Sequence, residues 1–203
     1  MAAQSPPDPR VPPDRAISVN GPMIAVIVGD GDEKTTFYIH EELICTHSNF
    51  FKNAMKPEWA EMRSDPRSVH LTDDDAEHLP VRVDEKSSEE YDQLAKAYVL
   101  GEKIMDDGFQ QGIFDAIIAK SAVLVQVGEG RTRYMPDFKA IQIIYEGTPE
   151  GFPARRLVVD FYSWEASESW FENLTVNPYP ADFLFDAMIR LASVREKLAT
   201  DKP

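Results

Sequence analysis

The spacing of large apolar side chains changes within residues 23–55, and this pattern constrains the fold more than any other part of the chain. The segment 23–29 (MIAVIVG) is a continuous apolar run, and the segment 35–40 (TTFYIH) combines β-branched and aromatic residues. The polar segment 30–34 (DGDEK) between them is typical of a turn. Two such runs around a short turn predict a β-hairpin.

Beyond His40 the apolar residues follow a helical rather than an alternating spacing. Ser48 followed by Asn49 is typical of a chain break and a helix N-cap. We therefore expect two short helices that meet at Ser48, and their apolar positions are Leu43, Ile44, Phe50, Phe51 and Met55.

Further elements are expected up to residue 124. The segment 56–67 is polar and contains prolines, so we expect a loop with one helical turn at most, and the segment 68–72 (SVHLT) alternates like a short strand. A helix with a capping box at Ser87 or Ser88 is expected next. A second helix follows the break at 106–108, with its apolar stripe at Phe109, Ile113, Ile117 and Ile118.

The last third of the chain is less regular. Residues 133–151 resemble a short strand that ends in a loop rich in glycine and proline. The spacing of apolar residues within 154–166 is compatible with either a strand or a helix. Residues 180–198 predict an amphipathic helix whose apolar side carries Leu184, Ala187, Met188, Leu191 and Leu198.

The formal net charge of −14 excludes two classes of partner. A nucleic-acid-binding protein needs a basic surface to neutralise phosphates, and anionic membranes attract basic segments. The densest basic pair is Arg155–Arg156, so we expect neither nucleic acid nor membrane as a partner. The single cysteine, Cys45, and the lack of an apolar signal segment predict a cytoplasmic or nuclear location.

No catalytic, cofactor-binding or metal-binding residues are predicted. Cys45 and His47 lie five and seven residues after His40, which is not the spacing of helical zinc ligands. No serine lies in a Gly-x-Ser-x-Gly motif. The alternative of a small enzyme with a site in the C-terminal region is supported only by scattered acids and by the aromatic residues Phe161, Tyr162, Trp164, Trp170 and Phe171.

Taken together, these elements predict an α+β fold, a short β-sheet with a cluster of helices. Residues 1–20 contain five prolines and little apolar surface, so we expect a disordered tail. We expect one domain over residues 21–124 and a mostly helical extension over residues 125–203.

The order of these elements resembles the BTB/POZ domain. The likeness rests on the segment IAVIVGDGDEKTTFYIHEELICTHSNFFKNAM, an apolar strand, a hairpin, an aromatic strand ending in His40, and two short helices divided at Ser48. The segment YDQLAKAYVLGEKIMDDGFQQGIFDAII is similar to the helix pair that closes this domain. The resemblance covers about residues 23–122. A weaker likeness to the C-terminal regions of fungal BTB proteins favours a helix over 154–166.

The resemblance implies a protein–protein interaction module rather than an enzyme. BTB domains self-associate through their first strand and first helices, which implies a homodimer interface at Ile24, Val26, Leu43 and Ile44. Some members bind a cullin scaffold of ubiquitin ligases through an apolar residue, any residue and a glutamate after the second short helix, which Trp59-Ala60-Glu61 matches. The expected partner-binding residues are Trp59, Glu61, Met55 and Phe51.

Alternatives to the adaptor role remain open. Trp59 could simply cover an edge of its own domain, and the chain could be a BTB transcription or scaffold protein that binds no cullin. The family also places an apolar helix after the strand at 68–72, whereas here His78 runs directly into Leu79. A chain without that helix could be a degenerate BTB protein.

Overall fold

The computed structural model describes residues 21–31, 34–73, 88–171 and 178–200. The chain divides into two compact units, unit 1 over Met1–Asp73 and unit 2 over Asp74–Pro203. The predicted tail at 1–20 and the predicted shortening between His78 and Leu79 lie outside the described residues. Both helices and strands are present, so the α+β class is confirmed.

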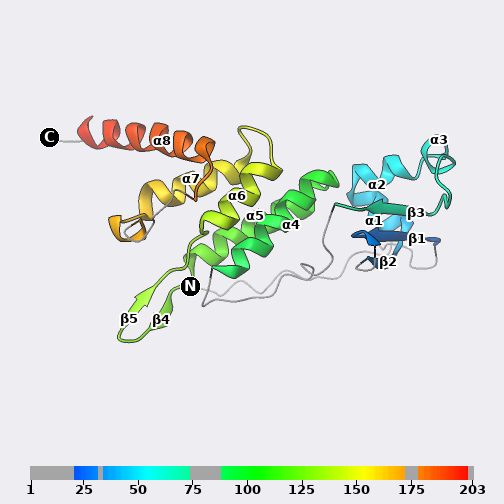
Figure 1. Ribbon diagram of the computed structural model, residues 1–203, viewed down its shortest axis with the longest axis horizontal. Helices are drawn as coiled ribbons and strands as arrows, with labels where there is room; N and C mark the ends of the chain where they lie inside the picture. The colour runs from blue at the N-terminus through cyan, green and yellow to red at the C-terminus, as the bar shows by residue number, and fades with distance from the viewer. Residues whose placement is uncertain (1–20, 32–33, 74–87, 172–177, 201–203) are drawn as a thin grey trace, which may run out of the picture. The chain divides into compact units, whose positions relative to one another are not determined.

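Unit 1 contains a three-stranded sheet (Figure 1). Its strands are β1 (Met23–Val28), β2 (Thr35–His40) and β3 (Ser68–Leu71), in the order β2-β1-β3. β1 and β2 pair antiparallel as the predicted hairpin, with Val26 opposite Phe37. The predicted strand β3 pairs parallel to β1, with Val26 opposite Val69. The hairpin and the third strand of the prediction are confirmed.

The described part of unit 1 also contains three short helices. They are α1 (Glu41–His47), α2 (Asn49–Ala54) and α3 (Pro57–Ala60). Ser48 separates α1 from α2, and its hydroxyl accepts a hydrogen bond from the backbone N–H of Phe51 at 3.3 Å. The N-cap predicted from the sequence is therefore present. The serine hydroxyl stabilises α2, since it binds a backbone amide that has no partner within the helix.

Alternate residues of β1 supply much of the core of unit 1. Strand side chains point alternately to opposite faces, and every second residue of β1 is buried. β3, α2 and α3 contribute the remaining buried apolar side chains. The set consists of Ile24, Val26, Val28, Phe51, Ala60, Val69 and Leu71.

Unit 2 is mostly helical (Figure 1). Its helices are α4 (Glu89–Lys103), α5 (Asp107–Ala122), α6 (Phe138–Gly147), α7 (Pro153–Glu165) and α8 (Ala181–Thr200), with the 3-10 turn η4 (Glu168–Trp170) after α7. A small hairpin of β4 (Val125–Val127) and β5 (Gly130–Thr132) follows α5 and was not predicted. The region 154–166 is helical, as the resemblance favoured.

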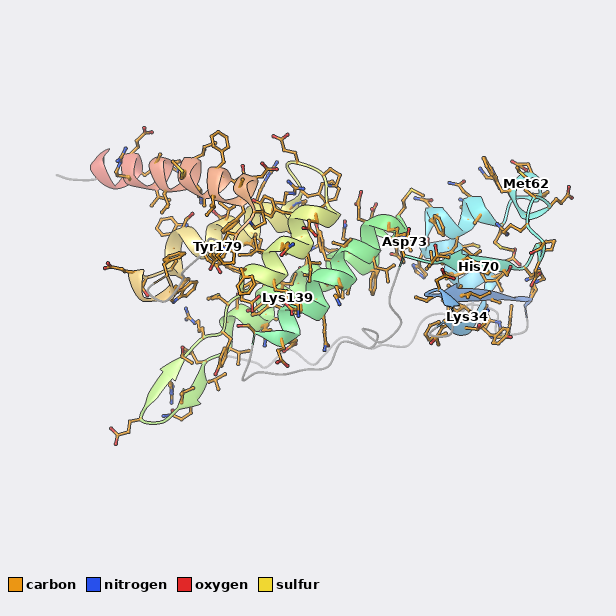
Figure 2. The ribbon with its side chains drawn as sticks, in the orientation of Figure 1. Lys34, Met62, His70, Asp73, Lys139 and Tyr179 are labelled. Atoms are coloured by element: carbon orange, nitrogen blue, oxygen red, sulfur yellow. The ribbon has the colours of Figure 1, made fainter. Side chains whose placement is uncertain are left out.

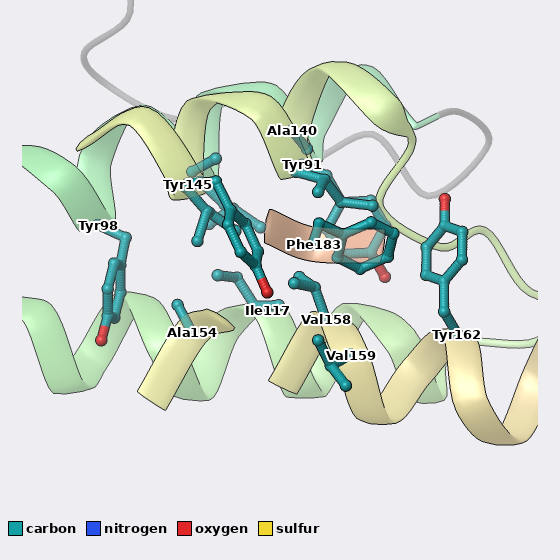
Figure 3. Close-up of a cluster of buried hydrophobic side chains, with 14 residues drawn as sticks. Tyr91, Tyr98, Ile117, Ala140, Tyr145, Ala154, Val158, Val159, Tyr162 and Phe183 are labelled. Carbon is teal, nitrogen blue, oxygen red and sulfur yellow. The ribbon is translucent and has the colours of Figure 1, made fainter. Parts of the chain in front are cut away.

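A single hydrophobic core joins all five long helices of unit 2 (Figure 3). Phe183 of α8 lies edge-to-face against Tyr145 of α6 and Tyr162 of α7, at ring-centroid distances of 5.7 and 5.2 Å. α4 and α5, which were expected to belong with the sheet, share this core with α6–α8. The compact units therefore divide the chain near residue 73, whereas the prediction placed the boundary at 124–125.

The segment 133–151 contains helix α6 rather than the predicted short strand. The carboxylate of Asp137 caps the helix, because its Oδ1 accepts hydrogen bonds from the backbone N–H groups of Lys139 and Ala140 at 3.0 and 3.2 Å. The buried positions Ala140, Ile141, Ile144 and Tyr145 follow a helical spacing. Packing of this face overrides the strand preference of the isoleucines.

Other local predictions were wrong in detail. Ser88 precedes α4 but makes no side-chain cap; its hydroxyl donates to the carbonyl of Met135 at 3.1 Å. Ile118, placed on the apolar stripe of α5, is exposed. On α8 the buried side chains are Phe183 and Val194, whereas Met188 and Leu191 are exposed. The side chain of Leu198 lies outside the described part of the chain.

The contact between α4 and α6 depends on the absence of a side chain at Gly147. A Cβ atom built there would lie 2.5 Å from both methyl carbons of Val99. In contrast, a Cβ at Gly112 in the middle of α5 would meet nothing within 4 Å.

We predict that Gly147→Ala destabilises the protein by about 2 kcal/mol, because a β-branched valine cannot move away without strain. Gly112→Ala should stabilise by about 0.5–1 kcal/mol, since alanine restricts the unfolded chain. Urea unfolding followed by circular dichroism measures both. Adding Val99→Ala to Gly147→Ala should recover part of the loss, and equal effects of the two glycine substitutions would contradict this packing.

Candidate functional site

The loop after α2 is held in a defined shape. Pro57 occupies the first turn of α3, where its missing N–H costs no hydrogen bond and its fixed φ suits a helix. The carbonyl of Lys56 accepts from the backbone N–H groups of Trp59 and Ala60 at 3.0 and 2.8 Å. Ala60 is buried. The short helix is therefore anchored at Ala60 while the neighbouring residues face outward.

Arg63 fixes the ends of this loop. Its Nη1 donates to the carbonyl of Ala54 at 2.8 Å, and its Nη2 donates to the carbonyl of Pro66 at 2.9 Å. Nη2 also contacts the sulfur of Met55 at 3.7 Å. Ala54 ends α2, so the guanidinium satisfies a carbonyl at the negative end of the helix dipole. One side chain thus ties α2 to the segment that precedes β3.

The exposed residues on this loop form what we call the Trp59 surface, defined as Trp59, Glu61 and Met62. Trp59 is 58% exposed, and Met62, labelled in Figure 2, is 78% exposed. Glu61 is also exposed. More than half of the Trp59 side chain is therefore open to solvent. Met62 was missed by the sequence analysis, although a methionine three residues after a tryptophan in a polar loop was a visible signal.

Two of the four predicted partner-binding residues do not reach this surface. Phe51 is buried and packs edge-to-face against Phe50 at a centroid distance of 5.1 Å. Met55 is partly buried beneath the guanidinium of Arg63. Phe51 therefore belongs to the core of unit 1, because only 2% of its surface is exposed. Trp59 and Glu61 are both exposed.

Of the four predicted dimer-interface residues, two are buried and two are at least partly exposed. Ile24 and Val26 are buried in the core of unit 1, and Ile24 is fully inaccessible. These two side chains cannot contact a second copy while unit 1 keeps this fold. Leu43 on α1 is 38% exposed, and Ile44 is partly buried. The prediction overlooked the strand alternation, which places every second residue of β1 inside.

The other face of the hairpin carries apolar residues toward solvent. Ala25 of β1 lies opposite Tyr38 of β2 in the register, and Met23 lies opposite His40. Tyr38 and Met23 are exposed. β2 is an edge strand of the sheet, so its outer hydrogen-bonding groups also face away from β1.

The thiol of Cys45 on α1 is partly buried. Partial burial, and then the nearby carboxylate of Glu41, raise the pKa of the Cys45 thiol, so the thiolate nucleophile is disfavoured. Among the described residues, no group of three or more histidine, cysteine, aspartate or glutamate side chains could hold a metal ion.

In the core of unit 2, burial raises the pKa values of the Tyr145 and Tyr162 hydroxyl groups.

A cleft of about 410 Å³ lies between α7 and α8 in unit 2. Two of its arginines have defined partners: Arg190 Nε donates to Asp160 Oδ1 at 2.5 Å in an ion pair, and Arg155 donates to the backbone carbonyls of Tyr145 and Thr148. The side chains that line the cleft include no serine, threonine, cysteine or histidine.

No family model, curated protein or solved structure matches this chain. In the part of the chain that the structure describes, no helix is long and apolar enough to cross a membrane.

We predict that Arg63→Met loosens the loop that carries Trp59. The substitution removes two charged hydrogen bonds to backbone carbonyls, so unit 1 should lose about 2 kcal/mol of stability. Hydrogen exchange of backbone amides in residues 56–66 should accelerate. Arg131→Met, at an exposed arginine of β5, is the control and should leave both quantities unchanged. Unchanged exchange in the Arg63 variant would show that the loop is held by other contacts.

Proposed function

We propose that this chain is a protein–protein interaction module of BTB type. The order of elements in unit 1 supports the proposal: a hairpin, a histidine, two short helices divided by a serine cap, and a strand added parallel to the first. This is the order that the resemblance implies for residues 23–72. Our proposal includes self-association and the recruitment of one further protein.

Recruitment is assigned to the Trp59 surface. The observation that carries this assignment is a tryptophan that is 58% exposed on a loop fixed by Arg63. Interface energy concentrates in aromatic anchors, and a rigid loop loses little entropy when it binds. Glu61 supplies a charged neighbour at the rim, where charge contributes to specificity.

A cullin scaffold is the partner class that the match of Trp59-Ala60-Glu61 favours. The chain would then act as a substrate adaptor of a ubiquitin ligase. In the alternative form of the proposal, the same surface serves a BTB scaffold or transcription protein without cullin binding.

Self-association is assigned to the exposed residues of the first strands and first helix. Leu43, Met23 and Tyr38 supply apolar side chains at the surface of these elements. Ile24 and Val26 are buried in the core of unit 1 and do not contribute to the contact.

We predict that immobilised cullin retains the wild-type protein and that Trp59→Ala lowers its affinity by at least about tenfold, the typical cost of removing an aromatic anchor. Trp164→Ala is the matched control, because Trp164 of unit 2 is 60% exposed. It should bind as the wild type does. Failure of the wild type to bind, or equal binding by Trp59→Ala, would discard the adaptor role and leave the alternative form.

We also predict that the wild type is a dimer in size-exclusion chromatography with light scattering, and that Leu43→Asp weakens the dimer by placing a charge in an apolar contact. Thr132→Asp adds the same charge at an exposed position of unit 2 and should have no effect. A wild-type monomer at high concentration would contradict self-association.

A further inference from the structure

A pocket of about 340 Å³ lies in unit 2, where the end of α6 meets the segment that leads into α8. It is lined by the segment 178–180 and by Gln142, Tyr145, Glu146 and Asp182. We call it the Tyr179 pocket. Among its described lining residues there is no lysine, arginine or histidine, so its two formal charges are both negative.

The two carboxylates of the pocket have no cationic partner. Glu146 and Asp182 are exposed, and neither forms an ion pair with a residue that the structure describes. Glu146 Oε1 accepts one hydrogen bond from Gln142 Nε2 at 2.8 Å, which leaves its charge uncompensated. Asp182 lies in the first turn of α8, where the helix dipole favours a carboxylate, whereas Glu146 lies in the last turn of α6, where the dipole disfavours one. The helix dipole therefore accounts for Asp182 but not for Glu146.

The segment 178–180 gives the pocket a wall of defined shape. Prolines on both sides of Tyr179 restrict the backbone, because each proline ring fixes its own φ. The hydroxyl of Tyr179, labelled in Figure 2, shares a hydrogen bond with the hydroxyl of Tyr162 at 3.3 Å. Its ring packs against Phe183 at a centroid distance of 5.6 Å, yet the residue stays partly exposed. A ligand would therefore meet an aromatic ring that is already held in place, which lowers the entropy lost on binding.

The other tyrosine of the pocket already contacts a cation of the chain itself. The guanidinium of Arg155 lies over the Tyr145 ring, 4.5 Å from its centroid, and the Tyr145 hydroxyl donates to Asp186 Oδ2 at 2.8 Å. Burial raises the pKa of Tyr145; the hydrogen bond to Asp186 and its charge raise it further, and Asp182 adds a smaller contribution. Because Arg155 occupies one face of Tyr145, Tyr179 is the ring more available to a ligand.

This lining suits an organic cation better than a metal ion. Calcium takes about six to eight oxygen ligands, and magnesium requires a near-octahedral set. The pocket offers two carboxylates beside aromatic and proline rings, and no metal-binding group of three such side chains occurs within the described ranges. Aromatic rings attract organic cations through their negative faces. The net charge of −14 also raises the concentration of cations near the surface.

We propose that the Tyr179 pocket binds a primary alkylammonium group, the group that ends a lysine side chain. The ammonium pairs with the carboxylates of Glu146 and Asp182, and the alkyl chain packs against Tyr179 and its flanking prolines. A lysine of a partner polypeptide and a small free amine both carry this group. The site lies in unit 2 and does not depend on the Trp59 surface or on self-association through unit 1.

Nuclear magnetic resonance titration of the full chain tests the proposal. Butylammonium chloride is the probe, and butanol, which has the same alkyl chain without the charge, is its control; sodium chloride holds the ionic strength constant. Butylammonium should shift the backbone amide signals of Glu146 and Asp182 and the ring signals of Tyr179 in a saturable way. Butanol should bind at least about tenfold more weakly, because it forms neither ion contact.

Nearly isosteric variants separate charge from shape. Glu146→Gln and Asp182→Asn should each weaken butylammonium binding by about threefold to fivefold, and the double variant by at least about tenfold. Glu129→Gln removes the same charge at an exposed position between β4 and β5 and should have no effect. Tyr179→Phe keeps the ring and should bind as the wild type does, whereas Tyr179→Leu should bind about twofold to fivefold more weakly.

The acetylated and amidated tripeptide Gly-Lys-Gly distinguishes the two sources of the group. If the tripeptide binds at least as tightly as butylammonium, the ligand is a lysine side chain; if it binds more weakly, the ligand is a small free amine. Equal binding of butanol, unchanged binding in the double variant, or an absence of saturable shifts at millimolar butylammonium would overturn the proposal. Displacement of butylammonium by calcium chloride at a lower concentration would also overturn it, in favour of a metal ion.

Discussion

The central position of β1 is the constraint on which unit 1 depends. β1 pairs antiparallel with β2 on one side and parallel with β3 on the other, so its backbone groups serve two neighbours. Its alternating side chains direct Ile24, Val26 and Val28 into the core. The partner binding that we propose for unit 1 therefore excludes these buried side chains and uses the loop held by Arg63, the exposed part of α1 and the outward face of the hairpin.

The elements predicted correctly are those specified by neighbouring residues in the sequence. The hairpin follows from two β-branched runs around a turn, and the helix boundary at Ser48 follows from a side chain that caps the amide three residues later. The unit boundary was not specified locally. It depends on contacts that join residues on either side of the predicted boundary, such as the hydrogen bond that the hydroxyl of Tyr91 on α4 donates to the carbonyl of Tyr134.

Burial was harder to predict than secondary structure. α6 was missed because its isoleucines suggest a strand, and only the Asp137 cap and the packing of Ile141 and Ile144 select the helix. α8 was predicted as a helix, but its apolar residues lie on two sides. The sequence cannot tell which side meets α7. Similarly, Trp59 in a polar loop was a usable signal, whereas the buried Phe51 on α2 was indistinguishable from a surface aromatic.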